Sequence, residues 1–251
     1  MTDSDRASIA ASCQPPALPL SLSVLVPVLN EERNLAPTVH TLLEALSETV
    51  GLYEIIVVND GSTDRTGEVA EQLAATHHCV KVVHEGRTRG IGHAYMQGYK
   101  EATCNYFVYI PGDNTWPVAS CRTLFLQLGR AHIVTSYASN PSVRSLGRRI
   151  LSTVYTRFLN MIFGRKMRYY NGLNIYPVNF LRSQQGISFG FGFQAEVLLK
   201  ALAAKLSYVE IGLEIDERAA GGSKAISVRN LTSVITTIIR LFFELRFRDH
   251  S

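Results

Sequence analysis

Two carboxylates in the first half of the sequence follow apolar runs, where they could do chemistry at the ends of strands. Asp60 directly follows the run EIIVVN, and Asp113 lies just beyond the run YFVYI. Open parallel sheets bind their ligands at the carboxyl ends of the strands. There the two side chains could contact the base or ribose of a nucleotide and its diphosphate–metal unit. A second interpretation stays open, in which Asp113-Asn114 only forms a turn and Asp113 caps a helix beginning near Pro117.

The segment Gly86–Gly92 adds a basic loop to these carboxylates. Its sequence, GRTRGIG, has the spacing of neither the Walker phosphate loop nor the GxGxxG dinucleotide motif. The two commonest nucleotide fingerprints are therefore absent. Four polar loops in all follow predicted strands, and three of them carry a carboxylate: 30–32, 59–64, 86–92 and 112–115.

The elements that must position these loops alternate between strand and helix. The predicted strands are Leu22–Val28, Glu54–Asn59, Val80–Val83, Tyr106–Ile110 and His132–Tyr137. The predicted helices between them run from Asn30 to about Val50, over Arg65–Thr76 and near His93–Ala102. Such alternation predicts an α/β fold with a parallel sheet and right-handed crossovers.

The second half of the chain is predicted to be helical and basic. Ser145–Phe163 has an i,i+4 apolar stripe of Leu146, Ile150, Val154, Phe158 and Ile162. Tyr169–Pro177 contains an Asn-Gly turn signal. Further on, the sequence predicts a helix over Gln194–Lys205, a strand over Tyr208–Leu213, a glycine-rich loop over Glu217–Lys224 and a last helix over Val228–Arg248.

The charge of the chain is polarised. Residues 1–137 sum to −5 and residues 138–251 to +9, and no acidic residue lies between Ala138 and Ala195. This asymmetry predicts that the second half meets an anionic ligand or surface. A nucleic acid is a poor match, because the acidic half carries the loops that would have to approach its phosphates. A membrane surface is the better match, although no run of about 18 apolar residues and no signal-peptide pattern is found.

Five blocks of sequence resemble, in this order, the inverting glycosyltransferases of family 2 with the GT-A fold. The last block, GFQAE…YVEIGLEIDERAAGGSK, is similar to the branch that glycosylates dolichyl or polyprenyl phosphate. The resemblance covers Leu22 to Lys224. The blocks are Val26–Asn34, Val57–Thr66, Arg89–Ala102, Ile110–Pro117 and Phe191–Lys224.

The resemblance implies a domain organisation around a Rossmann-like, mostly parallel sheet flanked by helices. Residues 1–20 lie before the matched blocks, and their polar and then proline-rich composition predicts a flexible arm. Residues 21–224 would be the catalytic domain. Within that domain, 21–137 would bind the nucleotide sugar and 138–224 the acceptor. Residues 225–251 would form a C-terminal amphipathic helix.

It also implies roles for residues at the donor site. The base and ribose would be lined by Pro27, Asn30, Glu31 and Asp60, with Arg89 near the nucleotide. Asp113 would take the place of the second acid of the family's DxD motif and meet the donor diphosphate through Mg²⁺ or Mn²⁺. The remaining donor residues would be Gln194 and Glu196 on a helix closing the sugar site, and Ser223 in a loop over the diphosphate.

Catalysis would rest on Asp113, Arg218 and Lys224, the last two from the same loop. Arg148 and Ser152 match an Arg-x-x-x-Ser pair that grips the acceptor phosphate. Purely structural alternatives stay open for four of these residues. Glu31 could be a first-turn helix acid, and Arg148 a solvated residue or a phospholipid contact. Gln194 could simply begin a helix, and Arg218 could be a surface charge at the end of a strand.

Several positions depart from the family pattern. The first DxD acid is Pro111 here, and Thr115 stands where a Gln often helps to hold metal. Tyr137 replaces an Arg that is common after the fifth strand, and Arg168-Tyr169-Tyr170 replaces an Asp-containing segment. A cation held by one carboxylate, phosphate oxygens and water is still compatible with Mg²⁺.

The function that follows is sugar transfer from a nucleotide-sugar donor to a polyprenyl phosphate, with inversion at the anomeric carbon. The enzyme would lie peripherally on the cytoplasmic face of a membrane, with a membrane-embedded partner subunit as a further hypothesis. Two alternatives stay open. One is a GT-A glycosyltransferase acting on a soluble or nucleoside-like acceptor, and the other is a non-catalytic protein that binds a sugar nucleotide or lipid.

Overall fold

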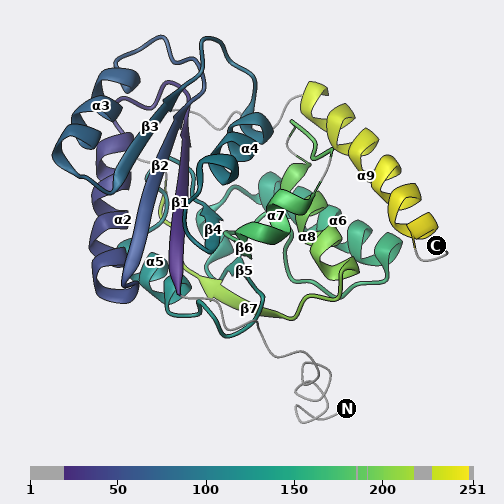
Figure 1. Cartoon of the computed structure of the whole chain (residues 1–251). Coiled ribbons are helices and arrows are strands. Elements are labelled where there is room, and N and C mark those ends of the chain that lie inside the picture. Colours follow the sequence, from purple (N-terminus) through teal and green to yellow (C-terminus); the bar gives the residue numbers. More distant parts are fainter. Residues whose placement is uncertain (1–19, 185, 191, 218–227, 249–251) are drawn as a thin grey trace.

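The computed structural model describes residues 20–184, 186–190, 192–217 and 228–248. They form a seven-stranded sheet in the order β3-β2-β1-β4-β6-β5-β7, with helices on both faces (Figure 1). The strands are β1 Ser21–Val28, β2 Leu52–Asn59, β3 Val80–His84, β4 Tyr106–Tyr109, β5 Ile133–Ala138, β6 Ile175–Pro177 and β7 Tyr208–Leu213.

The sheet is mostly parallel, so the predicted α/β architecture is confirmed. The three-residue strand β6 is the exception, since it pairs antiparallel with both β4 and β5. It was not predicted as a strand, because three residues after an Asn-Gly turn leave no period to recognise. With β6 between them, β4 and β5 still run in the same direction. Their carboxyl ends therefore lie at the same edge as those of β1 and β2.

Helices cover the two faces of this sheet. They are α2 Leu35–Thr49, α3 Thr66–Thr76, α4 Ile91–Glu101, α5 Val118–Phe125, α6 Leu146–Phe163, α7 Val178–Ser183, α8 Phe193–Ala203 and α9 Val228–Arg248, with a 3₁₀ turn η1 over Pro141–Val143. One apolar core lies against α2, α3 and α5, and a second lies against α4, α7 and α8.

The residues of β1 alternate between these two cores. Val24 and Val26 belong to the core under α2, whereas Leu25 belongs to the core under α4. A strand buried on both faces reads as an unbroken apolar run, which explains the sequence LSVLVPV. Helix α4 approaches β1 closely, because a Cβ on Gly98 would lie 2.8 Å from the Leu25 side chain.

Helix α2 begins five residues later than predicted. The sequence pattern placed its start at Asn30, but the helix starts at Leu35. Asn30 has a left-handed backbone with a φ of 55°, which an α-helix does not allow. Residues 30–34 instead form a loop that bonds to the loop after β2.

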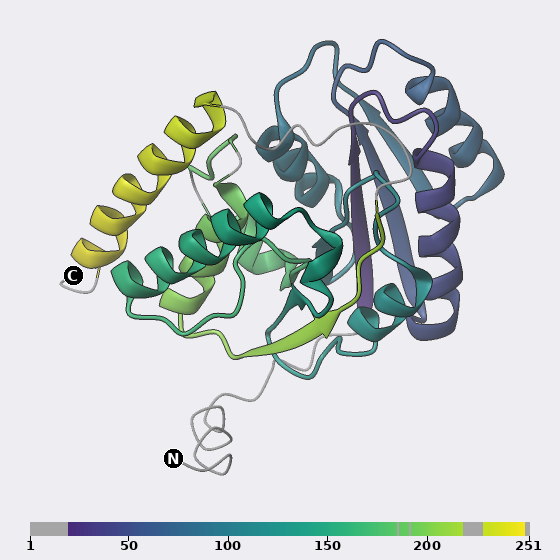
Figure 2. The same cartoon turned by 180° about the vertical axis from the view of Figure 1, so that it is seen from behind.

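Helix α6 has its apolar side outward. Its stripe residues Leu146, Ile150, Val154 and Phe158 are exposed, whereas Thr156 and Leu159 face the protein. Helices α6 and α9 lie side by side at the end of the molecule away from α3 (Figure 2), with the rings of Phe163 and Phe242 6.4 Å apart. Among the described residues, no helix is long and apolar enough to cross a membrane.

A buried carboxylate, Glu54, ties together the opposite, amino-terminal edge of the sheet. It accepts hydrogen bonds from Ser23 Oγ at 2.6 Å, Lys81 Nζ at 2.6 Å and Thr103 Oγ1 at 2.8 Å. Burial raises the pKa of Glu54, but these hydrogen bonds outweigh it and leave the pKa below its usual value.

Replacing Glu54 by Gln should therefore destabilise the fold by about 2 kcal/mol at neutral pH, as expected for loss of charge-assisted hydrogen bonds. A lowered pKa contributes stability above the unfolded value of about 4.3, and the contribution is lost as the pH falls through the folded value. The free energy of unfolding is measured with urea at pH 7 and below pH 4. The difference between Glu54→Gln and wild type should be smaller at the lower pH. The exposed Glu68→Gln is the control, and equal stability of Glu54→Gln and wild type at pH 7 would contradict the analysis.

Candidate functional site

The loops after β1 and β2 are joined by hydrogen bonds that use Asn30. Its backbone N–H donates to Ser62 Oγ at 3.0 Å, and its side-chain Oδ1 accepts the N–H of Thr63 at 2.8 Å. Glu31 continues this contact, since its N–H donates to Thr66 Oγ1 at 2.8 Å. Pro27 lies half-buried near the end of β1. These predicted donor residues therefore lie together at the carboxyl edge of the sheet.

Asp60 is a buried anchor for the basic loop. Its two carboxylate oxygens accept the backbone N–H groups of Arg89 and Gly90, at 2.8 and 2.9 Å. The loop also passes close to Gly61, where an added Cβ would lie 2.6 Å from the Thr88 nitrogen. Gly61 has a φ of 74°, so glycine is favoured there on both counts. Both carboxylate oxygens of Asp60 are therefore engaged by the backbone of the basic loop.

The side chain of Arg89, in this loop, is held by Glu85 and His93. Its Nε lies 3.3 Å from Glu85 Oε2, and its Nη1 donates to His93 Nε2 at 3.2 Å. If Nε2 accepts, the proton of the neutral ring is on Nδ1, which lies 3.4 Å from Glu85 Oε1. The guanidinium is half-exposed, so it can meet an anion at the edge while Glu85 fixes its direction.

Asp113 lies in a tight turn between β4 and α5. Its Oδ1 accepts the hydroxyl of Thr115 at 2.8 Å, and the next residue, Asn114, has a φ of 54°. The alternative that Asp113 caps the following helix is wrong, because α5 follows Pro117 without a side-chain cap. The carboxylate is partly exposed, and its second oxygen has no hydrogen-bond partner among the described residues.

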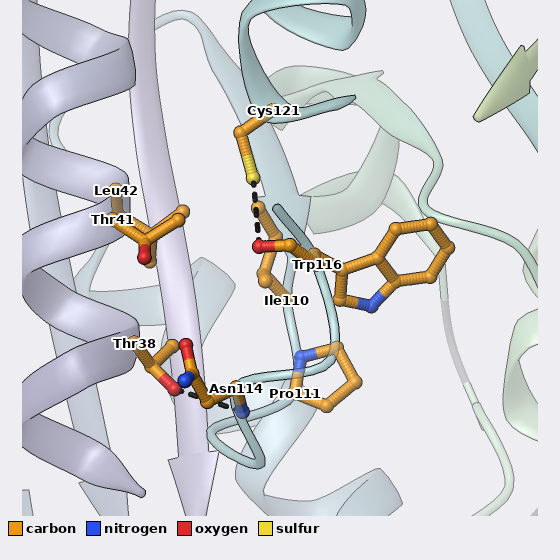
Figure 3. Close-up of a pocket in the computed structure, with 8 residues that line it drawn as sticks. All are labelled: Thr38, Thr41, Leu42, Ile110, Pro111, Asn114, Trp116 and Cys121. Atoms are coloured by element: carbon orange, nitrogen blue, oxygen red, sulfur yellow. Dashed lines mark hydrogen bonds between the residues drawn. The ribbon is translucent and has the colours of Figure 1, made fainter. Parts of the chain in front are cut away.

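The turn that contains Asp113 is held by Thr38 of α2, a residue that the sequence analysis did not single out. Figure 3 shows Thr38 and Asn114 pointing toward one another, and the N–H of Asn114 donates to Thr38 Oγ1 at 3.0 Å. The two residues line a small hollow with Pro111 and Trp116. They are 76 positions apart, so no local pattern could have revealed the contact.

A divalent cation would have few protein ligands here. Within the described parts of the chain, no three His, Cys, Asp or Glu side chains cluster as a metal site. Asp113 supplies one carboxylate, and Pro111 offers no ligand in the position of a second. This set fits a cation of the Mg²⁺ type only when phosphate oxygens and water complete the coordination.

The chain that leaves β7 begins beside Asp113. The N–H of Asp216 donates to the carbonyl oxygen of Thr115 at 2.9 Å. Asn140 fixes the preceding residue, since its side chain both accepts from and donates to the backbone of Ile215, at 3.0 and 2.9 Å. The predicted loop residues Arg218, Ser223 and Lys224 follow and lie outside the described residues.

Glu196 is a fully buried hub between α8 and α9. Its Oε1 lies 2.7 Å from Arg240 Nη2 and 3.1 Å from Lys200 Nζ, and its Oε2 accepts the N–H of Ser188 at 2.9 Å. Gln194, on the first turn of the same helix, is only half-buried. The carboxylate of Glu196 therefore holds α9 and the loop before α8.

The loop before α8 contacts the start of α4, next to the basic loop at the carboxyl edge of the sheet. The N–H of Gly92 donates to the carbonyl oxygen of Phe189 at 3.1 Å, and an added Cβ on Gly92 would lie 2.4 Å from Ser188 O.

The predicted acceptor residues lie elsewhere, on the first turns of α6. Arg148 is exposed and Ser152 half-buried, and their i,i+4 spacing puts them on one side of the helix.

Comparison with known proteins now adds family information. A model of the family described as Glycosyl transferase family 2 matches residues 23–188. A Dolichol-phosphate mannosyltransferase of Pyrococcus furiosus is 37% identical over 99 residues, which are 39% of this chain and 27% of that protein. The Low-salt glycan biosynthesis hexosyltransferase Agl6 of Haloferax volcanii is 26% identical over 198 residues, 76% of this chain and 46% of that protein. The chain therefore spans less than half the length of these relatives.

Solved structures share the fold. Glucosyl-3-phosphoglycerate synthase from Mycobacterium tuberculosis, crystallised with Mn²⁺, UDP-glucose and phosphoglyceric acid, superposes with a TM-score of 0.67. It is 21% identical, and the match covers 88% of this chain and 79% of that one. At this identity the likeness establishes the fold alone.

Replacing Asp60 by Asn should loosen the loop that it anchors. An amide offers one acceptor oxygen where the carboxylate offers two, and its NH₂ would face a backbone N–H. With the loss of charge-assisted hydrogen bonds worth about 1.5–3 kcal/mol, the amides of Arg89 and Gly90 should exchange with deuterium about 10- to 100-fold faster.

Hydrogen–deuterium exchange followed by mass spectrometry of peptides over 86–92 measures this effect. The matched control is Asp64→Asn, because that carboxylate bonds to Thr66 and Glu32 and not to the basic loop. Unchanged exchange over 86–92 in Asp60→Asn would show that the loop does not depend on the carboxylate.

Proposed function

Because the chain belongs to glycosyl transferase family 2, we propose that it transfers a sugar from a nucleotide-sugar donor to a polyprenyl phosphate. The family accounts for the GT-A fold and for a nucleotide-sugar donor. The polyprenyl phosphate, the inversion at the anomeric carbon and the place at the cytoplasmic face of a membrane are the proposed part. The name of the Pyrococcus relative, a dolichol-phosphate mannosyltransferase, supports the first of these, the polyprenyl phosphate.

The observation that carries the proposal is an exposed apolar surface, the α6–α9 face. It consists of Leu146, Ile150, Val154, Phe158 and Met161 of α6 and of Ile239 and Phe243 of α9, which are 43–74% exposed. Exposed apolar side chains that recur along a helix are typical of a binding surface, and an amphipathic helix with cationic neighbours suits the lipid interface. Arg148, Arg149 and Arg157 supply exposed cations on the same helix.

The proposed chemistry is an in-line displacement at the anomeric carbon. An oxygen of the acceptor phosphate forms the new bond while the bond from that carbon to the nucleoside diphosphate breaks, and the diphosphate leaves with the electron pair. A phosphate monoester is largely ionised at pH 7, so alignment replaces a strong general base.

The residues of the chain divide this work. Asp60 holds the loop of Arg89 and Gly90 against the nucleotide, and Arg148 with Ser152 orients the acceptor phosphate. Asp113 would hold Mg²⁺ or Mn²⁺, which when bound neutralises charge on the leaving diphosphate. Arg218 and Lys224, with Ser223, would cover the diphosphate from the loop that starts beside Thr115. A membrane-embedded partner subunit would extend this arrangement.

A second candidate is transfer to a soluble, phosphorylated acceptor. The phosphoglyceric acid bound by the Mycobacterium tuberculosis neighbour favours it. That candidate keeps the same donor edge but gives the α6–α9 face no role. Binding of a sugar nucleotide without turnover would correspond to the non-catalytic alternative.

The test is a donor screen with Asp113→Asn beside wild type. GDP-mannose, UDP-glucose and UDP-N-acetylglucosamine are each offered with polyprenyl phosphate in detergent or with a soluble phosphate monoester, in the presence of Mn²⁺ or Mg²⁺. Wild type should form one lipid-linked sugar, detected by mass, and Asp113→Asn should lower turnover at least about 100-fold, since the metal contributes several kcal/mol. The exposed Glu101→Gln, at the end of α4, should match wild type. Turnover only with soluble phosphates, or none at all, would overturn the lipid acceptor.

Membrane binding is tested by Leu146→Ser, with Leu52→Ser as a matched control. Both leucines are 66% exposed, but Leu52 lies at the opposite edge of the sheet. Burial of a Leu side chain is worth about 1.5–3 kcal/mol. Leu146→Ser should therefore lower co-sedimentation with anionic vesicles about tenfold, and Leu52→Ser should leave it unchanged. Equal effects of the two changes would show that the α6–α9 face does not dock on lipid.

A further inference from the structure

Two arginines are held on tyrosine rings at the carboxyl end of β5. The guanidinium of Arg168 lies 4.6 Å from the ring centroid of Tyr137 and also donates to its hydroxyl. The guanidinium of Arg144 lies 5.7 Å from the ring of Tyr169, and its Nη1 donates to that hydroxyl at 3.3 Å. We call these four residues the Arg–Tyr cluster. Stacking on a ring fixes the direction of a guanidinium without consuming its charge.

The fold brings the cluster to the edge where the donor loops lie. Tyr137 is the penultimate residue of β5, which runs parallel to β7 and in the direction of β4. The segment carrying Arg168 is pressed onto β5, since the N–H of Leu173 donates to Ser136 Oγ at 2.8 Å. Gly172 lies so close that an added Cβ would be 1.9 Å from Ser136 O.

The positive charge of the cluster is only partly offset by a carboxylate. The charge of Arg168 opposes the rise in the pKa of Glu210 that burial causes, but the two side chains form no close ion pair. In the part of the chain that the structure describes, neither guanidinium has an ion-pair partner within 4.0 Å. Glu210 of β7 accepts the backbone N–H of Arg168 at 2.9 Å, not its side chain. A pair of fixed guanidinium groups is a strong site for the oxygens of a phosphate.

The apolar surface begins where the cluster ends. Leu146, the first residue of α6, follows Arg144 by two positions and is 66% exposed. From there the α6–α9 face continues along the helix through Ile150 and Val154. A ligand with a dianionic head and a long apolar tail would match both parts at once.

We propose that Arg168 and Arg144 bind the phosphate monoester of the acceptor, so that the cluster is a specificity-determining part of the acceptor subsite. This inference rests on the proposed function and deepens it. Arg148 and Ser152 belong to α6, whereas Arg168 comes from the loop before β6. The phosphate would therefore be held between two segments of the chain. The same chemistry could serve a lipid phosphate or a soluble phosphate monoester.

The experiment measures binding to the full chain by isothermal titration calorimetry. The probes are farnesyl phosphate below its micelle concentration, glycerol 3-phosphate, farnesol, and the nucleoside diphosphates UDP and GDP. The variants are Arg168→Gln and Arg168→Lys, with Arg130→Gln, at an exposed arginine after α5, as the matched control. Thermal melts confirm that each variant folds.

Arg168→Gln should weaken farnesyl phosphate binding at least about tenfold, as for loss of one charge-assisted contact. Arg168→Lys should recover part of it, because the charge returns without the planar fork. Farnesol and the nucleoside diphosphates should bind to Arg168→Gln as to wild type, and Arg130→Gln should bind all probes as wild type does. Wild type should prefer farnesyl phosphate to glycerol 3-phosphate if the source is a lipid, and the reverse preference would assign a soluble phosphate to the cluster.

Equal binding of farnesyl phosphate by wild type and Arg168→Gln would overturn the inference. So would a wild type that binds neither phosphate. Neither result decides the proposed reaction, because the donor screen detects a lipid-linked sugar independently of where its phosphate is held.

Discussion

The carboxylate of Asp60 holds two backbone amides at once, and the geometry of the carboxyl edge depends on it. A buried carboxylate is costly unless its oxygens are satisfied, and here the N–H groups of Arg89 and Gly90 satisfy both. The basic loop after β3 is largely exposed and rich in glycine, so these two bonds fix its backbone together with the side-chain contacts of Arg89. Gly92, two residues after Gly90, donates its N–H to Phe189, so the loop before α8 is attached to the end of the basic loop.

A second buried carboxylate extends this constraint to the C-terminal helix. Glu196 binds the loop through Ser188 and α9 through Arg240, and Lys200 bridges onward to Glu244 at 3.2 Å. Removing one partner of such a network leaves a buried charge uncompensated, which costs free energy. The partners are therefore held in fixed positions relative to one another. The orientation of α9 is therefore tied to a loop that touches the donor edge. A helix proposed to lie on lipid and a loop proposed to face a nucleotide share one carboxylate.

The strands of the sheet and the carboxylates that follow them could be predicted, because a buried strand appears in the sequence as a local run of apolar residues. The sequence predicted neither strand β6 nor the start of α2, because a three-residue strand and a left-handed Asn30 leave no periodic signal. Contacts between distant positions were also beyond reach. Thr38 meets Asn114 across 76 positions, and Arg240 meets Glu196 across 44. For α6 the period of the stripe was readable, but not which side faces the protein.

That direction decides what α6 can do. A stripe buried on the sheet would have been core, but Thr156 and Leu159 face inward and Leu146 and Val154 face out. Because α6 follows β5 after only a short turn, its first residue lies close to the carboxyl edge. An amphiphile lying along the helix would have its charged end toward the edge where the donor loops lie. If α6 lies on lipid as proposed, the same connection would lead from the lipid surface to the proposed site of sugar transfer.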